Sequence, residues 1–128
     1  MSGYRYVTIP APVTIVDDDG EPVLQSNGKP HVVHFREFLL SRTRDATIFG
    51  ASLDAIIAMN AIESEFRGKG EGEVVKLPSA EWDLLKAACE KPTGGYNPGI
   101  AGQIVSMPLA VRNAPDKQPV ATLAAAAE

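Results

Sequence analysis

The stretch EVVKLPSAEWDLLKAACE, residues 73–90, carries the clearest structural pattern in this chain of 128 residues. Its two β-branched valines favour a short strand. The Pro-Ser pair that follows suits the first turn and the cap of a helix. Side chains at helical spacing then form one packing face, which comprises Trp82, Leu85, Ala88 and Cys89. The segment therefore predicts a strand, a capped turn and a helix that packs against a core.

Two further segments predict strands. Residues 4–16 are rich in β-branched and aromatic side chains, which favour extended backbone. Pro10 and Pro12 interrupt this segment, and because proline cannot donate to a ladder, the strand should bend or lie at a sheet edge. Residues 31–35 form the next strand, after two turn clusters rich in Asp, Asn and Gly. We expect residues 13–16 to pair with residues 31–35, as a hairpin or as a pair with a long loop, and residues 73–77 to join the same sheet.

Three helices are expected, near residues 35–42, 52–67 and 79–90. Residues 100–113 are a weaker helix candidate, because Pro108 lacks a backbone donor. Together with the strands, this predicts the α+β class, with a small, mostly antiparallel sheet covered by about three helices.

The middle helix shows the broadest amphipathic pattern. Ser52 or Asp45 can cap its start, and Gly68 can end it in a left-handed conformation. We expect its apolar face to pack in the core, with Leu53, Ile56, Ile57, Met59, Ile62 and Phe66. The residues expected to face water are Asp54, Glu63, Ser64 and Arg67.

A single domain should span residues 1–113. A chain of this length can bury a core without metals or disulfides, and an apolar content of 45% is typical of a globular protein. Residues 114–128 continue no apolar period, so we expect a flexible tail containing Ala and Pro.

Charge and hydropathy exclude several classes of function. The net charge is -4, and no two of the 12 basic residues are adjacent, so we expect no nucleic-acid partner. No apolar run approaches the roughly 20 residues of a membrane-spanning helix. The N-terminus lacks the pattern of a secretory signal. Cys89 is the single cysteine, so no disulfide forms within the chain. We expect a soluble, cytoplasmic protein with no membrane partner.

No motif carries a convincing chemical signal. His31 and His34 would point to opposite faces of a strand, and a zinc site needs more ligands than these two. Residues 17–20 resemble part of a calcium loop but lack its first and last ligands. The glycines at 68–72 follow a helix and precede a strand, the reverse of a phosphate-binding loop. The sequence therefore predicts no metal and no cofactor.

We expect no catalytic residue and no enzyme activity. Cys89 lies late in an apolar-faced helix, where burial and the helix dipole raise a thiol pKa, so it should be buried and inert. Two alternatives remain open. One is a small-molecule or nucleotide-binding inhibitor or sensor that uses the loop at 93–99. The other is a small hydrolase-type enzyme with His31 or His34 as general base.

Partner contact is the remaining role for exposed aromatic side chains. The candidate partner-binding residues are Tyr4, Tyr6, Trp82 and Tyr96. The three tyrosines lie near the N-terminus or in a glycine-rich loop, which favours exposure. Trp82 has two interpretations, a partner anchor or a core residue, and its apolar face favours the core.

Three segments within residues 7–90 resemble a known class of small proteins. They are IPAPVTIVDDDG at 9–20, VHFREFL at 33–39 and EVVKLPSAEW at 73–82. In style they are similar to small proteins encoded among tailed-phage or prophage structural genes. The resemblance implies a virion component or assembly factor that works as an oligomer. The leading hypothesis is therefore a non-enzymatic protein–protein interaction module that binds a protein partner or itself, cytoplasmic or, if phage-encoded, virion-associated.

Overall fold

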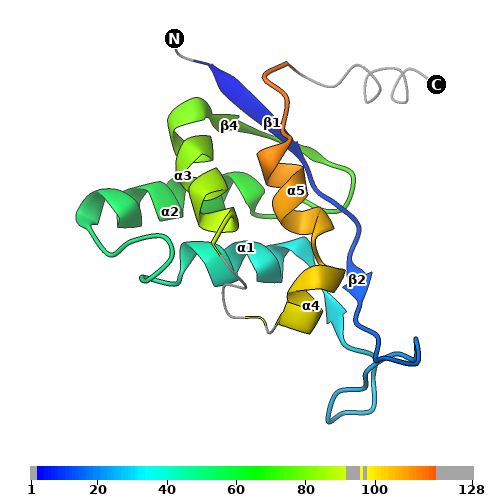
Figure 1. The fold of residues 1–128 in the computed structure, drawn as a ribbon. Coiled ribbons are helices and arrows are strands. Elements are labelled where there is room, and N and C mark those ends of the chain that lie inside the picture. The colour runs from blue at the N-terminus through cyan, green and yellow to red at the C-terminus, as the bar shows by residue number, and fades with distance from the viewer. Residues whose placement is uncertain (1–2, 92–95, 97, 118–128) are drawn as a thin grey trace, which may run out of the picture.

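A computed structural model describes residues 3–91, 96 and 98–117 of the chain (Figure 1). The strands are β1 (Tyr4–Thr8), β2 (Val13–Thr14), β3 (Val32–Val33) and β4 (Val74–Pro78). The helices are α1 (Phe35–Thr43), α2 (Leu53–Phe66), α3 (Ser79–Cys89), α4 (Pro98–Gln103) and α5 (Ser106–Arg112). The fold class is α+β, as the sequence predicts, and α1, α2 and α3 begin and end within one residue of their expected bounds.

The strands form two separate antiparallel pairs instead of the single sheet expected. β1 pairs with β4 over five residues, and β2 pairs with β3 over two, which confirms the predicted hairpin in a shorter form. Pro10 and Pro12 explain the division. The β1–β4 ladder continues to Ile9, whose N–H donates to the carbonyl of Glu73 at 3.0 Å. Beyond that point the prolines offer no donors, so the chain leaves the first pair before the second begins.

Local signals set the helix ends. The Ser52 side chain accepts a hydrogen bond from the N–H of Ala55 at 3.1 Å, so it caps α2. Gly68 adopts a φ of 77° just after α2, as expected. Pro108 is the third residue of α5, where a helix N–H has no internal partner, so two short helices replace the single weak candidate. Among the described residues, no helix is long and apolar enough to cross a membrane.

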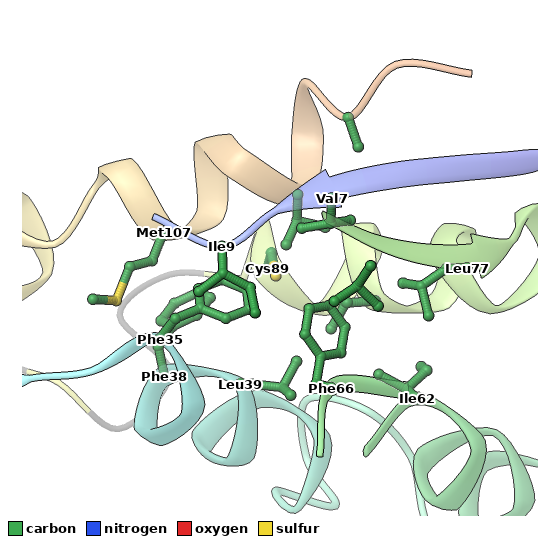
Figure 2. Close-up of a cluster of buried hydrophobic side chains, with 14 of the residues drawn as sticks. Val7, Ile9, Phe35, Phe38, Leu39, Ile62, Phe66, Leu77, Cys89 and Met107 are labelled. Carbon is green, nitrogen blue, oxygen red and sulfur yellow. The ribbon is translucent and has the colours of Figure 1, made fainter. Parts of the chain in front are cut away.

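The core lies around α3, which packs against α1, α2, α5 and both strands of the β1–β4 pair. Figure 2 shows part of it, where Phe35, Phe38 and Phe66 meet aliphatic side chains. The ring centroids of Phe35 and Phe66 are 5.5 Å apart. The largest fully buried side chains are Val7, Val33, Phe38, Leu39, Ile62, Leu77, Leu85, Ile104, Met107 and Val111.

The packed chain extends past the domain boundary expected at residue 113. Ala114 is 3% exposed, and its carbonyl accepts a hydrogen bond from Arg5 at 3.1 Å. The N–H of Tyr6 donates to the carbonyl of Pro115 at 2.9 Å. The first residues of the expected tail therefore run along β1, while residues 118–128 lie outside the described part of the chain.

Candidate functional site

An exposed apolar surface lies on the N-terminal half of α2. Leu53, Ile56 and Ile57 expose 72%, 43% and 57% of their surface, and we call these three residues the α2 patch. The prediction that they pack in the core is wrong, whereas Ile62 and Phe66 in the second half are buried as expected. In Figure 1 α3 crosses α2, and the first turns of α2 project to one side beyond this crossing.

The second half of α2 is tied to α1 by a buried carboxylate. The helical pattern places Glu63 on the face that can meet water, but in the structure Glu63 is 7% exposed. Arg44 donates two hydrogen bonds to it, from Nη2 at 2.9 Å and from Nε at 3.1 Å, and the Thr43 hydroxyl donates a third at 2.8 Å. The Arg44 hydrogen bond is the main cause that lowers the pKa of Glu63, against burial, which raises it. The helical pattern of α2 contains no sign of these partners, because they lie 19 and 20 residues away.

Trp82 lies in the core, as the apolar face of its helix indicates. It is 7% exposed, and its Nε1 donates to the carbonyl of Val111 at 2.8 Å. The guanidinium of Arg5 lies 4.3 Å from the ring centroid. The indole thus contacts α5 and β1. The role of Trp82 as a partner-binding residue stays a prediction. Contact with a partner would require the indole to leave this packing.

The three tyrosines occupy two different regions. Tyr4 and Tyr6 are two residues apart on β1, so they share one face of the strand. Tyr4 is 45% exposed, and the Lys76 ammonium lies 4.1 Å from its ring centroid. Tyr96 is half-buried against the core, and burial raises the pKa of its hydroxyl. Tyr4 is therefore the most accessible of the predicted partner contacts, which themselves stay predictions.

The histidines and the acidic turn form no ligand cluster. His34 is exposed at the N-cap position of α1, and His31 is half-buried just before β3. Within the ranges that the structure describes, no group of three His, Cys, Asp or Glu side chains could hold a metal ion. The Asp17 carboxylate accepts hydrogen bonds from the backbone N–H of Asp19 and of Glu21, so it closes its own turn. Most of the loop at 93–99 lies outside the described residues.

The core contains two buried ionisable side chains, Cys89 and Arg42. Cys89 is 5% exposed, which confirms its predicted burial, and burial raises the pKa of its thiol to about 12. Arg42 is 3% exposed, and its Nε and Nη1 have no hydrogen-bond partner in the described structure. Its guanidinium lies 4.8 Å from the Phe38 ring centroid. Desolvation is the main cause that lowers the pKa of Arg42. The sequence pattern gave no sign of this buried charge.

A cavity of about 440 Å³ opens beside the N-terminus of α1. It lies between the Pro10–Pro12 segment, the first turn of α1 and the turn that follows α2. Its lining consists of Ile9, Pro10, Pro12, His34, Phe35, Arg36, Phe66, Lys69, Gly70 and Glu71. The last of these segments belongs to the glycine-rich stretch at 68–72, and no motif in the sequence marks it as part of a cavity.

Comparison with known proteins gives no family to which the chain can be assigned. No family model matches the sequence, and neither a curated protein nor a solved structure is significantly similar to it.

Proposed function

We propose that this protein is a non-enzymatic protein–protein interaction module that associates with a second copy of itself through the α2 patch. The observation that carries the proposal is the exposure of Leu53, Ile56 and Ile57 on one well-capped helix. Moving a large aliphatic side chain from full exposure to full burial is worth about 1.5–3 kcal/mol. Covering the α2 patch with a partner would therefore contribute favourable free energy that the isolated chain lacks.

A second copy is a suitable occupant because a two-fold interface is self-complementary. Two α2 helices that cross near Ile57 would place each patch against the other. Asp54 and Asn60 are exposed on α2 beside the patch and would supply a polar rim. The apolar area is small beside a standard interface of about 800 Å² per partner, so we expect association in the micromolar range.

The protein would act through this self-association as a structural or assembly component. The support for this role is the resemblance of three segments to small proteins encoded among tailed-phage or prophage structural genes. Such proteins work as oligomers, and the α2 patch gives this chain a surface suited to that behaviour.

Sedimentation velocity across micromolar concentrations tests the proposal. The wild type should shift from monomer to dimer as concentration rises. Ile57→Glu should stay monomeric, because a carboxylate at the centre of the interface would lose its water. Leu24→Glu is the matched control, since Leu24 is 61% exposed but lies outside α2.

The control should associate as the wild type does. A wild type that stays monomeric at the highest concentration would exclude self-association through this helix. Equal association of both variants would place any interface elsewhere on the molecule.

A further inference from the structure

The cavity beside α1 has the size and the lining of a ligand site. Its volume of about 440 Å³ lies in the range of small-molecule pockets, roughly 300–1,000 Å³. Three segments distant in the sequence form it, so its shape depends on the folded chain. It is separate from the α2 patch, since the two share no residue.

The floor of this cavity is apolar and partly aromatic. Ile9, Phe35 and Phe66 line it, and each is at most 6% exposed. Figure 2 shows these three side chains converging beneath β1. Pro10 and Pro12 add further apolar surface at the opening. A ring or short hydrocarbon chain would therefore lose its hydration against a preformed apolar surface.

The rim carries more positive than negative charge. Arg36 and Lys69 both line the cavity, and within the described residues neither forms an ion pair or a side-chain hydrogen bond. The charge of Arg36 helps to lower the pKa of Glu63, but the two side chains form no salt bridge. Among the described residues of the lining, Glu71 is the one carboxylate, and His34 adds a further nitrogen donor or acceptor.

Backbone groups support the same preference. Phe35 and Arg36 are the first two residues of α1, and in the described structure their N–H groups donate no hydrogen bond. The positive end of a helix dipole favours an anion near such groups. The carboxylate of Glu73 is already bound to the N–H of Gly70, so it closes the neighbouring turn.

We propose that this cavity binds a small amphipathic anion, a carboxylate or sulfonate carried on an aromatic ring or a short acyl chain. The apolar part lies against Phe35 and Phe66, and the anionic group lies between Arg36 and Lys69. This inference is independent of self-association, since it uses none of the α2 patch.

Titration of the isotope-labelled full chain with phenylpropionate, followed by backbone amide NMR, tests the proposal. Phenylpropanol is the neutral matched probe. The anion should shift amides around Phe35 and Gly70 and should bind about fivefold or more tightly than the alcohol, because the two rim cations attract the carboxylate through a solvent-screened interaction that the alcohol lacks. Added salt should reduce this difference.

The double variant Arg36→Gln, Lys69→Gln should weaken phenylpropionate binding by about the same factor. Lys29→Gln, Lys91→Gln is the matched control, since it removes equal charge from two exposed positions outside the cavity, and its affinity should stay at the wild-type value. Ile57→Glu should also bind as the wild type, which separates this result from the test of self-association.

Three outcomes would overturn the proposal. They are amide shifts absent from the cavity, equal affinity for the acid and the alcohol, and equal loss in the double variant and its control. The comparison of the two probes uses only the wild type, so it decides the matter even if the double variant fails to fold.

Discussion

Arg42 places a guanidinium in the core, and part of this group lacks hydrogen-bond partners among the described residues. Its Nε and Nη1 lack partners in the described structure, and its face lies 4.8 Å from the Phe38 ring centroid. A cation–π contact returns about 0.5–2 kcal/mol, whereas an unsatisfied buried charge costs more. On balance this residue should weaken the fold.

Arg42→Met should raise the free energy of unfolding by about 1 kcal/mol, because methionine keeps the apolar contact with Phe38 and removes the unsatisfied charge. Urea denaturation measures the change. Arg44→Met is the control with the same substitution on a guanidinium that is hydrogen-bonded to Glu63, and it should lower stability. A destabilised Arg42→Met would show that the guanidinium contributes more to the core than its contacts indicate.

At the scale of the element, α2 is divided between two environments. Its second half packs on the core and is held to α1 by the Arg44–Glu63 pair at 2.9 Å, while its first half carries the α2 patch. The pair acts as a link between the ends of two helices. Its contribution should depend on pH, since one partner is a carboxylate.

Arg44→Gln should flatten the acid side of the stability curve. The folded protein lowers the pKa of Glu63, so this group adds stability above its unfolded pKa, and that stability is lost as pH falls through the folded pKa. Removing Arg44 removes the largest cause of the shift, so the loss between about pH 5 and pH 3 should shrink.

Thermal denaturation at several pH values measures this effect. Asp45 and Glu90 also have lowered pKa values and remain in both proteins, so the difference between the curves isolates the pair. Arg67→Gln removes an exposed arginine that follows α2 and should leave the shape of the curve unchanged. Parallel curves for Arg44→Gln and the wild type would contradict the assignment.

The ends of α2 could be predicted from the sequence, whereas its surroundings could not. Ser52 and Gly68 act through hydrogen bonds and φ angles within a few residues, so their effect is visible locally. The exposure of Ile57 depends on which other elements pack against the first half of α2, and the burial of Glu63 depends on Arg44, which lies outside α2. A helical pattern separates apolar from polar faces but contains no information about which face is covered.

The same limit applies to the whole molecule. The cavity brings Arg36 and Lys69 together from segments more than thirty positions apart in the printed sequence, and no local motif marks either residue. The division of the strands into a β1–β4 pair and a β2–β3 pair follows from Pro10 and Pro12, which are visible in the sequence as interruptions. The sequence does not show that this interruption leads to two separate sheets, with the cavity beside the N-terminus of α1.

The two ends of the described chain meet at β1, which makes the C-terminal segment part of the fold. A chain that ends at Lys117 keeps the Arg5 bond to Ala114 and the Tyr6 bond to Pro115. A chain that ends at Asn113 loses both hydrogen bonds and the buried Ala114 side chain. Each bond is worth about 0.5–1.5 kcal/mol, so this second truncation should cost about 2 kcal/mol in all.

Urea denaturation of both truncated chains beside the full chain tests this expectation. The chain ending at Lys117 should match the full chain, because it keeps both hydrogen bonds to β1 and the buried Ala114. The chain ending at Asn113 should unfold at a lower urea concentration with a similar slope, since little surface is lost. Equal midpoints for the two truncations would mean that Ala114 and Pro115 lie on β1 without stabilising it, and would return the domain boundary to residue 113.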